Sequence, residues 1–165
     1  MLRNATVLIV DDDPFSRTIV SKKLKSFTRV VEASDGMEVV PGTVYVAPGD
    51  YHMVVKREGA HTRLDLNQGP PENSCRPAVD VLFRSVAQVY GNRALAVVLT
   101  GMGNDGEKGS VVLRDAGSQI IAQDQATSVV WGMPGAVARA GLADQVLALG
   151  EIGTAITSKV SRRGR

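Results

Sequence analysis

Short apolar runs and longer stripes at helical spacing alternate along this chain. Runs that predict strands cover the segments Thr6–Val10, Thr28–Ala33, Thr43–Ala47, Ala94–Leu99, Gln119–Ala122 and Gln145–Leu149; Ala94–Leu99 is expected to be buried on both faces and Gln145–Leu149 to be an edge strand. Apolar positions with a period near 3.6 predict helices with Ile19, Val20, Leu24 and Phe27 on one face, over Ala78–Tyr90, over Glu107–Ala116, and over Pro134–Ala140. Strands and helices in alternation predict a three-layer α/β/α fold with a mainly parallel sheet.

One stretch departs from this alternation and predicts antiparallel strands. Thr43–Ala47 and Met53–Lys56 flank a Pro-Gly-Asp turn, which predicts a hairpin. Arg63–Leu66 is expected to add a third antiparallel strand. A polar, proline-containing loop over Asn67–Pro77 then leads into the next helix.

Composition narrows the classes of function. With 165 residues, 44% of them hydrophobic, the chain is long enough for one compact domain. A net charge of +2 with 22% charged residues predicts no nucleic-acid partner. One cysteine and two histidines leave no disulfide and no structural Cys/His zinc site. The apolar run before Asp11 is too short for a signal peptide or a membrane span, so we expect a cytoplasmic protein without membrane insertion.

The strongest chemical signal is the glycine-rich loop Gly101–Gly106, which follows an apolar strand. We expect it to leave the carboxyl end of a central strand, where α/β proteins gather ligands and catalytic groups. The candidate site residues are therefore Thr100, Met102, Asn104 and Asp105.

Two chemistries fit this loop. The spacing G-x-G-x-x-G, with Asp124 about 20 residues further on, is typical of dinucleotide binding. Asp105 opposes that reading, because its charge would lie beside the pyrophosphate at a helix N-terminus. An aspartate in this position can instead orient a histidine that serves a serine nucleophile, with backbone amides nearby for an oxyanion. Dinucleotide binding is the weaker alternative.

Four blocks of the sequence resemble the catalytic domain of the chemotaxis protein-glutamate methylesterase. They are Val31–Met53, Arg76–Ala87, Val97–Gly106 and Ile120–Val137. The resemblance implies hydrolysis of glutamate methyl esters on a methyl-accepting chemotaxis receptor. It also implies that Asp105 is the acid of a Ser/His/Asp triad, and that the backbone of Met102 helps to form the oxyanion site.

The sequence departs from this family at the other two triad positions. The family's G-x-S-x-G-G loop and its Gln-His-Met segment do not occur in this chain. His52 matches a family position outside the triad, so a positional or substrate-side role for it, with Thr100 and Asn104 on the substrate side, stands beside that of a satisfied surface histidine. His61 is expected on an exposed turn. We therefore predict a catalytically impaired methylesterase domain. The alternative is a non-catalytic module that binds the receptor or another partner.

The N-terminal segment Val7–Phe27 resembles the first strand and helix of a response-regulator receiver domain. Asp11 and Asp12 then match the acid pair that binds magnesium, and apart from this ion we expect no cofactor. We expect the change of resemblance between Phe27 and Gly36, so that residues 1–30 form a receiver-like βα unit within the same domain. A natural remnant, an internal deletion and a chimera would all produce this pattern.

The remaining expectations concern the end of the chain and its association. Residues 31–150 are predicted to form the methylesterase-like part, and residues 151–165 a basic, solvated tail containing Lys159, Arg162, Arg163 and Arg165. An open edge of the parallel sheet is a route to homo-oligomers.

Overall fold

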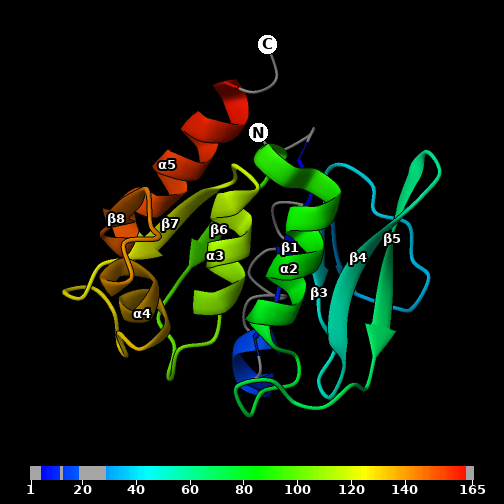
Figure 1. Cartoon of the computed structure of the whole chain (residues 1–165), viewed down its shortest axis with the longest axis horizontal. Helices are drawn as coiled ribbons and strands as arrows, with labels where there is room; N and C mark the ends of the chain where they lie inside the picture. Colours follow the sequence, from blue (N-terminus) through cyan, green and yellow to red (C-terminus); the bar gives the residue numbers. More distant parts are fainter. Residues whose placement is uncertain (1–4, 12, 19–28, 163–165) are drawn as a thin grey trace. The chain divides into compact units, whose positions relative to one another are not determined.

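The computed structural model describes residues 5–11, 13–18 and 29–162. The chain divides into two compact units, Met1–Leu82 and Phe83–Arg165. Each unit has its own hydrophobic cluster and its own parallel sheet, and the first unit adds an antiparallel pair (Figure 1). The predicted mixed α/β fold with mainly parallel strands is therefore confirmed.

The parallel sheet of the first unit has β3 in the middle. Its strands are β1 (Val7–Ile9), β2 (Arg29–Glu32) and β3 (Thr43–Val46), in the order β1-β3-β2. All four residues of β3 are buried, as expected of a strand that lies between two others. Val30, Val44 and Val46 form the cluster that holds the sheet together.

The predicted hairpin between the third and fourth strands is wrong. β3 pairs in parallel with β1 and β2, whereas β4 (His52–Glu58) pairs antiparallel with β5 (His61–Asn67) over seven residue pairs (Figure 1). The two-residue turn at Gly59 and Ala60, with φ +59° at the glycine, closes this hairpin. An entirely apolar strand such as β3 is typical of a parallel sheet, while β4 and β5 have the exposed polar positions of a hairpin.

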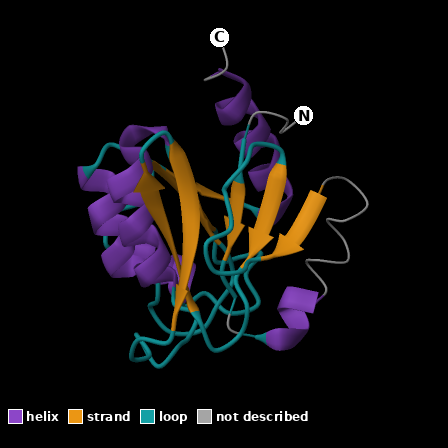
Figure 2. Cartoon of the chain, turned by 90° about the vertical axis from the view of Figure 1, so that its right-hand side faces the viewer, coloured by secondary structure: helices purple, strands orange, loops and turns teal. Residues whose placement is uncertain are grey.

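A short helix covers residues 14–18, immediately after Asp13 (Figure 2). Asp13 Oδ2 accepts the Ser16 N–H at 2.6 Å, and this hydrogen bonding to Ser16 keeps the pKa of the Asp13 carboxyl below its ordinary value. Asp13 is thus the N-cap of this helix, and Pro14 stands at its first position, where a backbone N–H has no partner within the helix. The rest of the predicted helix, with Ile19, Val20, Leu24 and Phe27, lies outside the described residues.

The second unit alternates helices with parallel strands. Helix α2 (Val79–Tyr90) begins at the end of the first unit and is followed by the 3-10 turn η1 (Gly91–Arg93). The remaining elements are β6 (Leu95–Val98), α3 (Glu107–Asp115), β7 (Gln119–Gln123), α4 (Met133–Arg139), β8 (Gln145–Leu147) and α5 (Leu149–Arg162).

The sheet of the second unit has the order β6-β7-β8, so its middle strand is β7. The expectation that the glycine-rich loop leaves the central strand is wrong within this sheet, because that loop follows β6. Burial agrees, since four residues of β7 are buried and only two of β6. Ile120 and Ala122 of β7 join Val98 of β6, Leu113 of α3 and Val137 of α4 in one core cluster.

The segment predicted to be a basic, solvated tail is helical as far as Arg162, where α5 ends. Ile152, Ile156 and Val160 recur every four residues, and Ile152 is buried. The basic residues suggested a tail, whereas this apolar period is typical of a helix. Lys159 donates a hydrogen bond from Nζ to Gln119 Oε1 at 3.2 Å, so one of the basic side chains contacts β7. Within the described ranges no helix, α5 included, is long and apolar enough to cross a membrane.

Candidate functional site

The glycine-rich loop connects the end of β6 to the start of α3. Gly103 and Gly106 have φ of +80° and +94°, values that glycine adopts without steric cost, and Gly106 is the N-cap of α3. The Glu107 N–H donates to Asn104 O at 3.1 Å, which closes the turn before the helix. The chain therefore makes two sharp changes of direction within six residues.

The four predicted site residues on this loop differ sharply in exposure. Asp105 is only 5% exposed, whereas Met102 is 85% exposed, and Thr100 and Asn104 are exposed as well. Asp105 lies directly before Gly106, so its backbone leads into the first turn of α3. The acid is thus held inside the unit while the loop presents its other side chains outward.

The loop after β7 is bound to this glycine-rich loop by hydrogen bonds. The Thr100 hydroxyl accepts the Val130 N–H at 2.9 Å and lies 3.1 Å from Val130 O, to which it donates. The Gly101 N–H donates to the same Val130 carbonyl at 3.0 Å, and Gly101 O accepts the Met133 N–H at 2.9 Å. These bonds join two segments about thirty residues apart into one rigid pair of loops.

Gly132 lets the two loops approach closely. A Cβ atom at this position would lie 2.7 Å from Gly101 O and 2.8 Å from Gly103 N. Backbone atoms cannot move aside as the end of a flexible side chain can, so a residue other than glycine would push the loops apart.

Asp124, which the dinucleotide hypothesis assigned to a ribose, serves a local turn. Its Oδ1 accepts the Thr127 N–H at 3.0 Å and the Thr127 hydroxyl at 2.5 Å. This is the Asx geometry that stabilises a turn within the loop after β7. The arrangement gives the dinucleotide alternative no support from its acidic residue.

His52 is buried in β4 rather than exposed on a turn. The side chain is 2% exposed, its Nε2 donates to Pro70 O at 3.0 Å, and its Nδ1 accepts the Ala78 N–H at 3.3 Å. Because an acceptor faces Nε2 and a donor faces Nδ1, the ring is the neutral Nε2–H tautomer. Both ring nitrogens therefore hold the loop over residues 67–78.

His61 lies at the start of β5, beside the hairpin turn, and is exposed as predicted. Its Nδ1 is 2.7 Å from Glu38 Oε1, so the carboxylate that orients this imidazole is Glu38. The two histidines are the only ones in the sequence.

An ion pair between Asp50 and Arg76, the Asp50–Arg76 clasp, also holds the loop over residues 67–78, here to the turn after β3. Arg76 approaches Asp50 Oδ1 with Nε at 3.0 Å and Nη2 at 2.5 Å, and donates from Nη1 to Gly69 O at 3.0 Å. The Arg76 guanidinium keeps the pKa of the Asp50 carboxyl below its ordinary value. Asp50 is thus a turn residue, with φ +65°, that anchors an arginine.

The acid pair near the N-terminus is described in part. Asp11 Oδ1 accepts the Asp13 N–H at 2.9 Å, and Asp12 lies outside the described residues. The part of the chain that the structure describes contains no group of three or more His, Cys, Asp or Glu side chains arranged to hold a metal. Magnesium binding by Asp11 and Asp12 stays a prediction.

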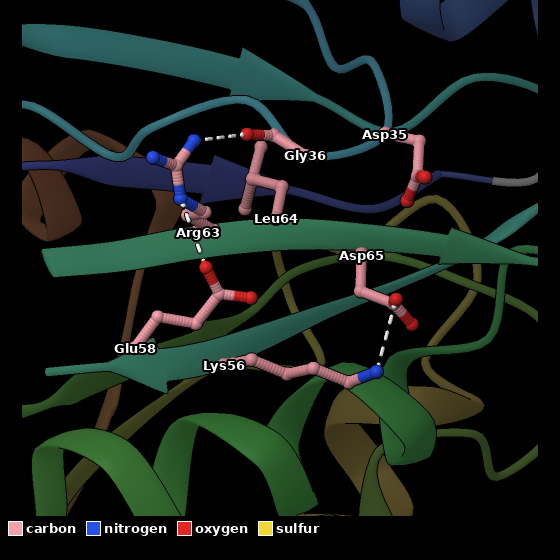
Figure 3. A pocket seen from close by; sticks show the side chains of 7 residues that line it. All are labelled: Asp35, Gly36, Lys56, Glu58, Arg63, Leu64 and Asp65. Carbon is pink, nitrogen blue, oxygen red and sulfur yellow. Dashed lines mark hydrogen bonds and ion pairs between the residues drawn. The ribbon is translucent and has the colours of Figure 1, made fainter.

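A cavity of about 160 Å³ opens on the hairpin of the first unit (Figure 3). Lys56 pairs with Asp65 at 2.9 Å, and Arg63 pairs with Glu58 at 3.0 Å and donates to Gly36 O at 2.8 Å. Its seven lining residues, five of them charged, are Asp35, Gly36, Lys56, Glu58, Arg63, Leu64 and Asp65. Since this lining contains no hydroxyl, thiol or imidazole, the cavity lacks the nucleophile and the base of a Ser/His site.

Comparison with known proteins shows the family to which the chain that carries these loops belongs. A model of the CheB methylesterase family matches residues 4–156, most of the chain. The chain belongs to the CheB methylesterase family. The recognition made from the four sequence blocks is therefore confirmed.

Two relatives and one solved structure show how far the likeness extends. A protein-glutamate methylesterase/protein-glutamine glutaminase of Nocardioides sp. is 57% identical over 134 residues, 81% of this chain and 37% of that protein. The protein of the same name from Trichodesmium erythraeum is 47% identical over 156 residues, 93% of this chain and 44% of that protein. The crystal structure of the Thermotoga maritima CheB methylesterase catalytic domain matches with a TM-score of 0.85 and 38% identity, covering 92% of this chain and 82% of that one.

This CheB-family chain spans less than half the length of the two relatives. The family match begins at residue 4 and so includes the segment that resembles a receiver domain. The receiver-like character of residues 1–30, the domain boundaries and the roles of Asp105 and Met102 stay predictions.

The sequence analysis did not predict a role for Gln123, which contacts both the glycine-rich loop and the loop after β7. Gln123 ends β7, and its amide bonds to Thr100 and Thr127. The available signal was a polar residue that directly follows the apolar run Ile-Ile-Ala of the predicted strand Gln119–Ala122.

Proposed function

We propose that this chain, by itself, is a recognition domain of the CheB family that binds its protein substrate without hydrolysing it. The names of its relatives describe enzymes that act on protein glutamate esters and protein glutamines. The expected ligand is therefore a protein segment with glutamate methyl ester or glutamine side chains, and the expected partner is a methyl-accepting chemotaxis receptor.

The engagement of both imidazoles is the observation that carries the catalytic half of this proposal. A serine nucleophile needs a general base within hydrogen-bond reach, and in the family that base is histidine. Both ring nitrogens of His52 form hydrogen bonds with the backbone, one with Pro70 and one with Ala78. His61 is oriented by Glu38. No G-x-S-x-G sequence occurs in the chain to supply the nucleophile.

The paired loops of the second unit support the recognition half. Asp105 is buried at the start of α3, and the hydrogen bonds between Thr100, Gly101 and the loop after β7 hold its loop in one conformation. Met102 and Val129, one from each loop, are 85% and 91% exposed. Exposed apolar side chains on a rigid backbone are typical of protein-binding surfaces.

A methanol-release assay on methylated receptor, run beside a binding measurement, tests both halves. The expected result is no methanol above the buffer level and saturable binding of the receptor segment to the immobilised chain. Full-length relatives provide the positive control for turnover. Met102→Lys and Val129→Lys should each weaken binding about tenfold, as expected for residues near the centre of an interface. Val111→Lys, at an exposed apolar position of α3, is the matched control.

Each half can fail separately. Saturable methanol release would contradict the absence of hydrolysis, and release that persists in Asp105→Ala would also remove Asp105 from any catalytic role. A folded chain that does not bind methylated or amidated receptor would contradict recognition.

A further inference from the structure

Gln123 is a buried polar residue at the end of β7, the middle strand of the second unit's sheet. It is 1% exposed and follows Ile120, Ile121 and Ala122, which are fully buried. An amide group removed from water costs free energy unless its donor and its acceptor are both satisfied. The partners of this amide therefore explain why a polar side chain is tolerated here.

The side chain of Gln123 forms hydrogen bonds with both loops, the glycine-rich loop and the loop after β7. Its Oε1 accepts the Thr100 N–H at 2.9 Å, at the start of the glycine-rich loop. Its Nε2 donates to Thr127 O at 2.7 Å, in the loop after β7. The backbone carbonyl of Gln123 accepts the Nε1–H of Trp131 at 3.0 Å, further along the same loop.

We propose that Gln123 is a positioning residue, which sets the conformation of both loops and so of the surface formed by Met102 and Val129. This inference rests on the proposed function in one respect, namely that these loops contact the protein ligand. The bonds between Thr100 and Val130 fix the outer part of the loops, and the Gln123 amide fixes their inner part where they leave the sheet.

Of glutamine, leucine and ionised glutamate, glutamine alone satisfies both partners at this position. Leucine has a similar shape but neither donates nor accepts. Ionised glutamate accepts the Thr100 N–H, yet it offers no proton to Thr127 O and places two acceptors together. Protonated glutamate has one acceptor and one donor, so it restores both bonds. The state of a carboxyl at residue 123 thus becomes a reversible control of the loop contacts.

Trp131 makes this control visible. It is the only tryptophan in the chain, its indole N–H bonds to Gln123 O, and Gly101 forms a bridge with it across the loops. All tryptophan fluorescence of the chain therefore comes from Trp131 and reports on the paired loops.

The test compares wild type with Gln123→Glu over a pH titration, following Trp131 emission and the hydrogen exchange of the Thr100 and Thr127 amides. Burial raises the pKa of a carboxyl, so the variant should match wild type on the acidic side of its transition. On the alkaline side the bond to Thr127 O is lost, so exchange of the Thr127 amide should exceed that of wild type at the same pH about tenfold or more, while the Thr100 amide keeps its acceptor. Exchange of the Ile120 and Ile121 amides in β7 should be unchanged.

Two further variants complete the test. Gln123→Leu should show fast Thr100 exchange at every pH, because it lacks both bonds. Gln125→Glu places the same charge two residues further along at an exposed position and should behave as wild type. The proposal is overturned if Gln123→Glu shows no pH-dependent change, or if Gln125→Glu shows the same one. Should Gln123→Leu fail to fold, the titration of Gln123→Glu decides alone.

The readouts need no receptor, so this inference and the proposed function fail independently. Altered loops with undiminished receptor binding would support positioning and contradict recognition by these loops. Unaltered loops, together with weaker binding by Met102→Lys, would contradict positioning and leave recognition in place.

Discussion

His52 and Asp105 are both buried ionisable residues, and both lie in segments that resemble the methylesterase family, yet their surroundings differ. In the first unit, the His52 ring supplies the hydrogen bonds that hold the loop over residues 67–78. In the second unit, backbone groups and buried amides hold the glycine-rich loop, and the side chains of Met102 and Asn104 remain exposed.

The difference separates two uses of a polar side chain. A side chain that supplies the rigidity of a loop has spent its donors and acceptors and cannot also act on a ligand. Where glycines and backbone hydrogen bonds make a loop rigid, as around Gly132, exposed side chains such as those of Met102 and Asn104 stay available to contact a ligand. Burial by itself does not distinguish the two uses; the identity of the bonded partners does.

The largest expected effect is the loss of the His52 ring. His52→Ala removes a buried ring and two bonds to the backbone, so the free energy of unfolding should fall by about 3 kcal/mol. Urea denaturation measures this loss. His61→Ala, which removes an exposed ion pair, should cost less than about 1 kcal/mol. Similar losses for the two variants would contradict the structural role of His52.

Gly132→Ala tests the close approach of the loops in the second unit. Gly132 has φ −78°, which alanine adopts readily, so the expected cost of about 2 kcal/mol comes from the Cβ atom and the backbone it meets. Urea denaturation followed by Trp131 emission detects it. Gly153→Ala in α5, where a Cβ meets nothing within 4 Å, should instead stabilise the chain by about 0.5–1 kcal/mol. If both substitutions stabilise, the loops are not in contact.

A smaller effect is expected from the Asp50–Arg76 clasp, and it should depend on pH. Because Arg76 lowers the pKa of Asp50 in the folded chain, the unfolded chain binds more protons in the acidic range. The stabilisation is therefore complete above the ordinary pKa of a carboxyl and disappears as the pH falls through the lowered value. Asp50→Asn, which tolerates the left-handed backbone, should be less stable than wild type near pH 7 and equal to it in acid. Urea midpoints across this range measure the difference, and a constant difference would contradict the clasp.

The smallest effect is expected at the charged cavity of the hairpin. Lys56→Gln breaks one exposed ion pair and should cost less than about 0.5 kcal/mol at low salt, and less still in about 1 M salt. Arg63→Gln should cost more, because Arg63 also donates to Gly36 O. Denaturation at two salt concentrations ranks the two variants. Equal, salt-independent losses would argue against these ion pairs.

Local patterns predicted most elements but not their partners. The apolar runs located β1, β3, β6 and β7, and the helical periods located α2, α3 and α4. The Pro-Gly-Asp turn suggested pairing of β3 with β4, although β3 pairs with β1 and β2. Turn residues show where a chain changes direction, while the burial of a strand on both faces decides which strands lie beside it.

The sequence by itself determined the family, the alternation of strands and helices, and the candidate loop that contains Asp105, because motifs and apolar periods are local properties. Tertiary structure decided which polar residues act as architecture. His52 meets Ala78 across 26 residues, and Gln123 meets Thr100 across 23. A hydrogen bond between residues so far apart depends on where the fold brings each backbone, and no local pattern contains that information.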